Sequence, residues 1–65
     1  MDNVTFGALL HELIDAAHKR GVYLMRCSQY SDEGGARLIA AEDGYEAQDK
    51  RVHELTERVM TARGV

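Results

Sequence analysis

Two histidines and an aspartate lie at helical spacing in the stretch HELIDAAH, residues 11–18. A zinc-protease helix needs two histidines four residues apart with a glutamate beside the first. His11 and Glu12 fit that pattern, but Asp15 stands where the second histidine is required. His11, Asp15 and His18 still share one stripe of a helix, which we expect to face water without the hydrogen-bonding partners that orient metal ligands. The sequence therefore predicts surface residues here, with no metal site and no cofactor.

The other reactive residues do not form a catalytic set. Cys27 is the single cysteine and has no histidine expected beside it, so it is interpreted as a small core thiol. His53 is expected to be solvated. The pair Gly34-Gly35 follows two carboxylates and is expected to lead into a strand, which disfavours phosphate binding. We therefore expect a protein that is not an enzyme, and a metal-dependent enzyme stays as a third hypothesis.

Length and charge bound the class of protein. A chain of 65 residues predicts one small domain, 1–65, without a deep catalytic cleft. The formal net charge of −3 disfavours nonspecific binding to nucleic acid or to an anionic membrane. The N-terminal segment has neither the pattern of a signal peptide nor that of a membrane span, so the chain is expected to be complete and cytoplasmic, in the host cytoplasm if a phage encodes it.

A first amphipathic helix is predicted at about residues 4–20. Asp2, Asn3 or Thr5 could cap its start, and Gly21 after two basic residues is typical of a helix stop. On a helical wheel, five apolar residues fall within about 80° of Phe6: Leu9, Leu10, Leu13, Ile14 and Ala17.

A second helix is predicted at about residues 44–63. Asp43 followed by Glu46 resembles a capping box at its start. Its apolar arc, which Gln48 interrupts, consists of Tyr45, Val52, Leu55, Val59 and Ala62.

The middle of the chain predicts a β-hairpin, with strands at about 22–30 and 36–42 and a turn over Asp32-Glu33-Gly34-Gly35. The expected fold class is α+β, an α-β-β-α domain with two amphipathic helices on an antiparallel hairpin. The alternative is that 36–47 is helical, because ARLIAAED is rich in helix formers. The face expected to be buried holds Tyr23, Met25, Cys27, Leu38 and Ala40. The face expected to be outward holds Leu24, Arg26, Ser28, Tyr30, Arg37 and Ile39.

Acidic residues are the best candidates for a binding surface. Carboxylates in such numbers could engage the basic, nucleic-acid-binding surface of another protein. The alternative is that they only solvate the surface and favour a helix dipole. The predicted protein-binding residues are Asp32, Glu33, Glu42, Asp43, Glu46, Asp49 and Glu57.

In format the chain resembles the small acidic anti-CRISPR proteins of phages and mobile elements. The resemblance rests on the 65-residue length, the lone Cys27 and the acidic runs at 32–33, 42–43 and 46–49. It implies a stoichiometric inhibitor that binds a protein subunit of a nucleic-acid-targeting defence complex and blocks its DNA site.

A nucleic-acid-binding regulator is the alternative function. Arg26 and Arg37 are expected on the outer face of the hairpin together with Tyr30, where they could contact nucleic acid. Such a protein could be a homodimer that pairs through the free edges of its hairpin.

Overall fold

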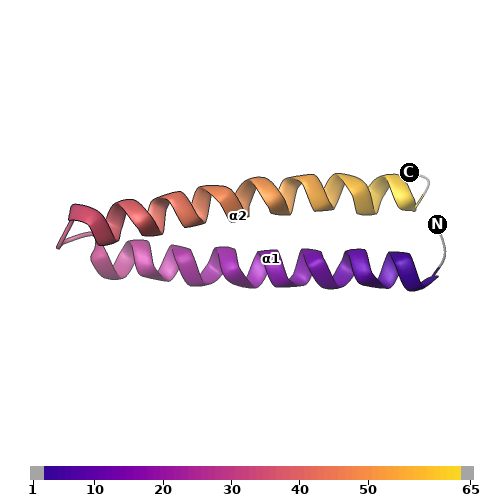
Figure 1. Cartoon of the computed structure of the whole chain (residues 1–65), viewed down its shortest axis with the longest axis horizontal. Coiled ribbons are helices and arrows are strands. Elements are labelled where there is room, and N and C mark those ends of the chain that lie inside the picture. Colours follow the sequence, from indigo (N-terminus) through magenta and orange to yellow (C-terminus); the bar gives the residue numbers. More distant parts are fainter. Residues whose placement is uncertain (1–2, 64–65) are drawn as a thin grey trace.

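The computed structural model describes residues 3–63 as two antiparallel helices joined by a short turn (Figure 1). Helix α1 runs over Asn3–Tyr30 and helix α2 over Gly35–Ala62, with 28 residues in each. Within residues 3–63 there is no strand, so the predicted α+β class and its β-hairpin are wrong. The fold is a helical hairpin, about three times as long as it is wide, with extents of 47 × 16 × 13 Å.

A heptad pattern explains why two long helices form. Each helix has eight inward positions spaced alternately by three and four residues, and every one of them is buried or half-buried. This 3.5-residue spacing keeps the inward positions facing the partner helix along the whole hairpin, as in a coiled coil. The inward positions, called the seam below, are Phe6, Leu9, Leu13, Ala16, Arg20, Tyr23, Cys27 and Tyr30 of α1, and Leu38, Ala41, Tyr45, Gln48, Val52, Leu55, Val59 and Ala62 of α2.

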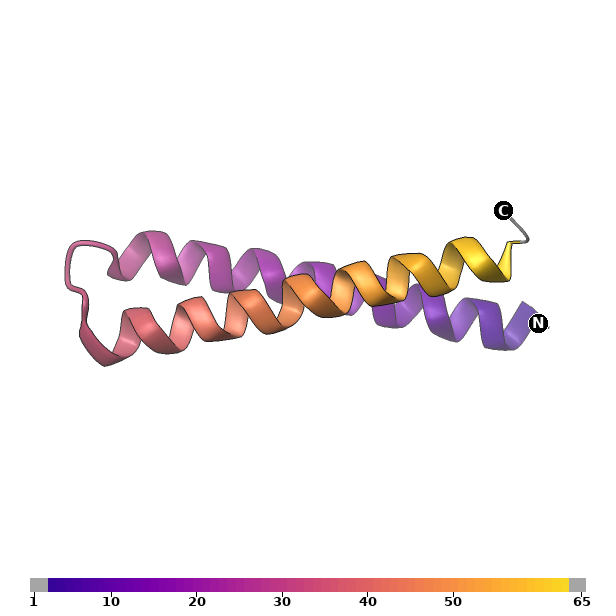
Figure 2. The same ribbon diagram turned by 90° about the horizontal axis from the view of Figure 1, so that it is seen from above.

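The crossing of the two helices agrees with that pattern. Seen from above, α2 passes over α1 at a shallow angle near the middle of the hairpin (Figure 2). A shallow crossing is the packing that a 3.5-residue repeat produces. The start of α1 and the end of α2 therefore lie at one end of the molecule, and the turn lies at the other.

The two glycines form the tight turn that the sequence predicts, but the turn joins two helices and not two strands. Gly34 and Gly35 have φ values of 66° and 74°, a region that glycine enters without steric cost. The amides of Glu33 and Gly34 both donate to the carbonyl oxygen of Tyr30, at 3.1 and 2.9 Å. These bonds satisfy the end of α1 and reverse the chain within residues 31–34.

Residues 22–30 continue α1 instead of forming a strand. Gly21 does not stop the helix: a glycine inside a helix costs about 1 kcal/mol relative to alanine, and the seam positions Tyr23, Cys27 and Tyr30 offset that cost by packing on α2. The predicted faces were right in part: Tyr23, Cys27 and Leu38 lie inward as expected, whereas Tyr30, expected outward, lies in the seam. Met25 was expected in the core, but a helix turns it away from the seam and leaves it 74% exposed.

Residues 36–42 belong to α2, so the alternative reading of 36–47 as a helix is confirmed. Asp43 and Glu46 lie inside that helix, and the predicted capping box at its start is wrong. Ala40, expected in the core, is exposed, whereas Ala41 is buried. The predicted cap at Asp2 lies outside the described residues.

The buried residues are concentrated toward the chain ends. Leu9, Ala16 and Leu55 form one cluster, with 9%, 0% and 3% of their surfaces exposed. All five apolar residues predicted for the inner arc of the second helix lie in the seam, which confirms that arc. The arc predicted for the first helix is partly wrong, because Ile14 is 67% exposed.

A polar layer divides this apolar half of the seam from the half near the turn. The Arg20 guanidinium donates to Asp49 Oδ1 at 3.0 Å, with both side chains about one-third exposed. Gln48 lies in the same layer, and its buried Oε1 has no hydrogen-bond partner among residues 3–63. A polar layer of this kind favours one register of the two helices, because sliding would separate the charged partners.

Candidate functional site

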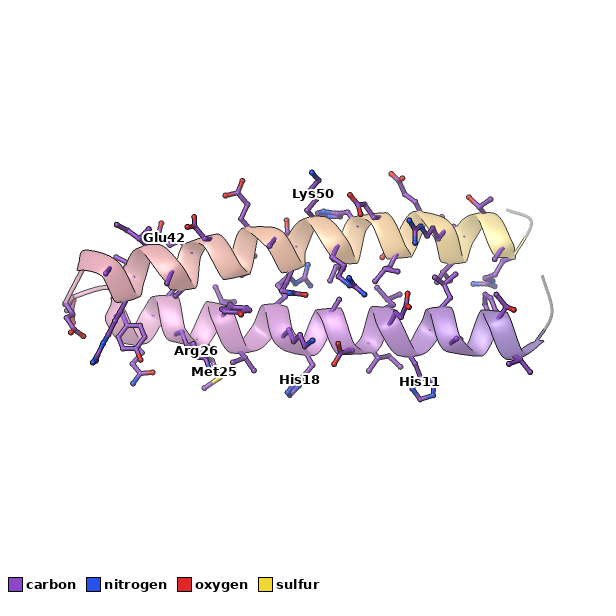
Figure 3. The ribbon with its side chains drawn as sticks, in the orientation of Figure 1. His11, His18, Met25, Arg26, Glu42 and Lys50 are labelled. Atoms are coloured by element: carbon purple, nitrogen blue, oxygen red, sulfur yellow. The ribbon has the colours of Figure 1, made fainter. Side chains whose placement is uncertain are left out.

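The histidine stripe lies on the outside of α1. Figure 3 shows His11 and His18 projecting from α1 on the side away from α2. Asp15, between them, forms an ion pair with Lys19 at 3.0 Å. Among residues 3–63, no three histidine, cysteine or carboxylate side chains lie close enough together to hold a metal ion. Neither of the helices described within residues 3–63 is long and apolar enough to cross a bilayer.

The seven predicted acidic residues lie at four separate places on the hairpin. Asp32 and Glu33 lie in the turn, and Glu33 approaches Arg37 at 4.0 Å. Glu57 lies two heptads beyond Asp43, about 21 Å further along α2, with Lys50 between them on the same row. Figure 3 shows Lys50 on the side of α2 that faces away from α1. The structure therefore does not gather all seven residues into one surface.

Glu42, Asp43 and Glu46 do lie together, and they are called the acidic patch below. They occupy adjacent rows within just over one turn of α2, on one side of the seam. All three side chains are exposed, and within the described chain none has an ion-pair partner.

Asp49 belongs to the hairpin's own packing and not to the acidic patch. It lies one turn beyond Glu46 and is bound to Arg20 of α1. Its Oδ2 also lies 3.7 Å from His53 Nδ1. Using this carboxylate to bind a partner would break a contact that joins the two helices.

Two arginines and two tyrosines form a second group, on the other side of the seam. The Arg26 guanidinium lies 5.5 Å from the centre of the Tyr23 ring, and that of Arg37 lies 5.8 Å from the centre of the Tyr30 ring. These distances fit cation–π contacts. All four side chains line a shallow hollow near the turn, which is called the basic hollow below and is floored by Ala40 and Ala41.

Gly44 positions one wall of the basic hollow. The Tyr23 ring packs directly on the backbone of α2 at this residue, and a Cβ added there would overlap the ring. Only glycine therefore allows Tyr23 to lie where Arg26 covers it. The sequence predicted Gly44 at the start of a helix and did not predict its contact with Tyr23. No local signal shows which residue a glycine faces across a hairpin.

A further open hollow lies between the helices near the chain ends. Its lining mixes apolar and polar groups from both helices, among them Leu9, Glu12, Glu54 and Arg58. It lies on the same side of the seam as the basic hollow, because both are lined by the row of α1 that contains Glu12 and Arg26. One side of the hairpin thus carries two hollows, and the acidic patch lies on the other.

The side that carries the acidic patch also holds an apolar stripe on α1. This set, called the α1 stripe below, lies in the two rows next to the seam and consists of Leu10, Ile14, Ala17, Gly21 and Leu24.

No protein-family model, curated protein or solved structure matches the chain. The resemblance to anti-CRISPR proteins therefore has no support from these comparisons. The α/β architecture predicted along with it is wrong, because the described chain is helical.

The sequence predictions missed two features that determine where the candidate site residues lie on the hairpin. The first is the heptad spacing from residue 6 to 30 and again from 38 to 62, which continues through the residues predicted as strands. The second is the α1 stripe, whose residues were assigned to the core, to a helix stop at Gly21 and to the outward hairpin face at Leu24. The repeat of three and four residues was visible in the sequence and could have revealed both.

Proposed function

We propose that this protein is a protein-interaction module without catalytic activity, which uses its acidic patch to occupy the basic, nucleic-acid-binding surface of another protein. The observation that carries the proposal is the exposure of Glu42, Asp43 and Glu46 on one side of α2 with no cation paired to them in the described chain. Carboxylates that lack internal partners can bind arginines or lysines without breaking a contact of the fold.

The hairpin presents these carboxylates in a fixed arrangement. All three are held by one 28-residue helix, which packs along its length on α1. Complementary charge accelerates encounter between proteins and fixes the orientation in which they dock. Because the helix backbone is already ordered, docking orders only the three side chains.

Such a module acts by occupancy. A protein surface that binds nucleic acid does so largely with lysine and arginine side chains aimed at phosphates. Carboxylates placed on those side chains exclude the phosphates, so inhibition needs one module for each site and no turnover. Salt screens exposed charges, so it weakens the binding of the basic surface to the acidic patch and its binding to nucleic acid.

The test is a charge reversal with a matched control. The variant E42K/D43K/E46K reverses the acidic patch, and E12K/D15K/E54K reverses three acids elsewhere with the same change in net charge. Wild type and the control are expected to capture the same nucleic-acid-binding protein from a cell extract and to block its DNA binding at a one-to-one ratio. The reversed patch is expected to do neither. Equal capture and equal inhibition by all three proteins would contradict the proposal.

Nucleic-acid binding is a second candidate, favoured by the basic hollow. The hollow brings together Arg26, Arg37 and Tyr30, which were predicted on one outward face of a hairpin, and adds Tyr23. Arginines beside aromatic rings are typical of sites where bases stack and phosphates are neutralised. The homodimer expected with this function was to pair strand edges, which do not exist in the described residues.

Fluorescence anisotropy with labelled single-stranded and duplex DNA distinguishes the two candidates. The nucleic-acid hypothesis predicts binding at about 20 mM salt that falls as salt rises, and that R26A/R37A removes. The acidic-patch proposal predicts no direct binding by wild type at any salt concentration. DNA binding that needs Arg26 and Arg37 would therefore replace the first candidate with the second.

A further inference from the structure

Helix α1 has a wider apolar arc than a two-helix hairpin covers. Beside the seam, the residues of the α1 stripe recur at intervals of four, three, four and three, the repeat that also builds the seam. Helices that pack side by side along their lengths show this spacing. In the described chain no helix covers the stripe, because Ile14 is 67% exposed and Leu24 is 55% exposed. The arc therefore has the width expected of a helix with two neighbours.

Helix α2 extends this apolar surface toward both of its ends. Ile39 and Met60 lie in the row of α2 that faces the same side of the hairpin as the stripe, and they are 60% and 51% exposed. Four of the six large apolar side chains that stay exposed in the described chain thus lie on this side. Apolar side chains gathered on one side, and not scattered singly, are typical of an interaction surface.

The same side carries negative charge that the hairpin does not neutralise. Leu24 follows Tyr23, which packs on Gly44, so this end of the stripe lies level with Glu42 and Glu46. Both carboxylates are exposed, and neither has an ion-pair partner within residues 3–63. A carboxylate that is covered by apolar groups and left without a partner is unfavourable. Whatever covers the stripe at this level therefore has to bring cations.

We propose that this side of the hairpin binds an amphipathic helix of another protein, whose apolar residues lie on the α1 stripe and whose lysines or arginines pair with Glu42 and Glu46. The proposal rests on the proposed function, since it uses two carboxylates of the acidic patch, and it names the element of the partner that they bind. The bound helix completes a three-helix bundle. Ala17 and Gly21, in the middle of the stripe, allow it to approach α1 closely.

The face also determines where the partner carries its charge. From Leu10 to Leu24 the stripe is about 21 Å long, which a helix of about 15–20 residues covers. At the end of the face away from the turn, the rows of α2 present Thr56, Met60 and the cation Arg63 in place of acids. The basic residues of the partner therefore belong to its turns nearest the turn of the hairpin, and the rest of its flank is neutral.

Fluorescence anisotropy with a labelled synthetic peptide tests the docking. The probe is an amphipathic helix of about three heptads, with leucine at its a and d positions, lysine on the flanks of its first two turns and glutamine elsewhere. A second probe carries glutamate in place of each lysine. Wild type is expected to bind the lysine probe at a one-to-one ratio and to leave the glutamate probe unbound.

Two variants of the full chain separate the apolar contact from the charge. I14Q/A17Q removes an apolar side chain and fills a small position, and it is expected to weaken binding of the lysine probe at least about tenfold. E42Q/E46Q removes two carboxylates and is expected to weaken it about fivefold. Both variants are expected to keep their helical circular dichroism, because the four positions are exposed and glutamine is a good helix former.

Matched controls make the same kinds of change on the other side of the hairpin. A8Q/A47Q places glutamine at two exposed positions, and E12Q/E54Q removes two exposed carboxylates. Both controls are expected to bind the lysine probe as wild type does. A wild type that does not bind this probe, or binding that survives I14Q/A17Q or E42Q/E46Q, would overturn the proposal.

Two further measurements examine other occupants of the face. Sedimentation velocity of the wild type alone is expected to show a monomer, and flotation with phosphatidylcholine vesicles is expected to leave the protein unbound. A dimer that I14Q/A17Q dissociates would assign the face to a second copy of the chain. Vesicle binding that I14Q/A17Q abolishes would assign it to lipid. Either result would overturn the proposal.

Failure of this proposal and failure of the proposed function give different results. If E42K/D43K/E46K loses the captured nucleic-acid-binding protein but I14Q/A17Q keeps it, the acidic patch acts without the stripe. The docked helix is then wrong and the proposed function stands. Equal capture by wild type and E42K/D43K/E46K contradicts the proposed function, whereas the peptide titration still decides whether this face binds a basic helix.

Discussion

The two helices match in length and in seam spacing, yet they differ in what they present outside the seam. Next to its seam, α1 places the neutral α1 stripe, in which Ile14 and Leu24 are more than half exposed. The corresponding rows of α2 carry Glu42, Glu46, Asp49 and His53, with Ile39 and Met60 toward the two ends of the helix. The same backbone geometry therefore gives one helix a surface suited to another apolar helix, and gives its partner a surface suited to basic groups.

This difference shows that apolar character alone does not identify the core of a small helical protein. The wheel of the first helix predicted Ile14 and Ala17 as buried, but the hairpin leaves both exposed and buries Ala16 completely. A helix that packs on one neighbour buries only a narrow seam. Apolar residues beyond that width indicate a further neighbour.

The largest contrast is expected between a seam leucine and a stripe isoleucine. Leu55→Ala removes a side chain that is 3% exposed and is expected to lower the free energy of unfolding by about 2–5 kcal/mol. Ile14→Ala is expected to cost less than about 0.5 kcal/mol, because that side chain is 67% exposed in the hairpin. Urea unfolding followed by circular dichroism measures both. Similar losses for the two variants in dilute solution would remove the distinction between seam and stripe.

Two glycines sharpen the comparison of the helices. Gly44→Ala of α2 is expected to destabilise the hairpin by about 1–3 kcal/mol, because the new Cβ overlaps the Tyr23 ring. Gly7→Ala of α1 meets no atom within 4 Å and is expected to gain up to about 1 kcal/mol from helix propensity. Thermal melts are sufficient, since the two changes have opposite signs. A stabilising Gly44→Ala would show that Tyr23 does not pack on α2 there.

The ion pair between Arg20 and Asp49, in the polar layer between the two halves of the seam, is expected to contribute less to the free energy of unfolding. A double-mutant cycle over Arg20→Ala and Asp49→Ala should give a coupling of about 0.5–1 kcal/mol, because both side chains are about one-third exposed. Denaturant unfolding of the four proteins gives the coupling energy, which should fall in 1 M salt. Zero coupling at low salt would mean that the polar layer does not favour the register.

The smallest effect is expected from the acidic patch. E42K/D43K/E46K changes three exposed side chains that make no ion pair within residues 3–63, so the unfolding free energy is expected to change by less than about 1 kcal/mol. The measurement is the same urea titration. A loss as large as that of Leu55→Ala would indicate that these carboxylates hold the hairpin together, which argues against a free binding surface.

Some elements of this fold could be predicted from local patterns. The inner arc of the second helix was correct because its apolar residues recur at helical spacing, and the turn glycines adopt the positive φ expected of them. Residues 22–30 were predicted as a strand because four consecutive apolar residues fit either structure. Whether this segment is helix or strand depends on the packing of Tyr23, Cys27 and Tyr30 on α2. That packing joins segments that are distant in the sequence.

The candidate site shows the same limit. The proximity of Glu42, Asp43 and Glu46 follows from any helical reading of that segment, and the alternative reading of 36–47 contained it. The pairing of Asp49 with Arg20, and the packing of Tyr23 on Gly44, depend on the register between two helices. Local propensity contains no information about that register, whereas a heptad pattern followed along both helices does.

The register of the hairpin underlies both proposed surfaces, and one nuclear Overhauser measurement tests it most directly. With α1 and α2 packed as described, the ring protons of Tyr23 lie beside the α-protons of Gly44, and a strong cross-peak with upfield-shifted glycine resonances is expected. The β-hairpin would instead give cross-peaks between α-protons of residues 22–30 and 36–42. The absence of the Tyr23–Gly44 cross-peak, with those strand cross-peaks present, would contradict the account.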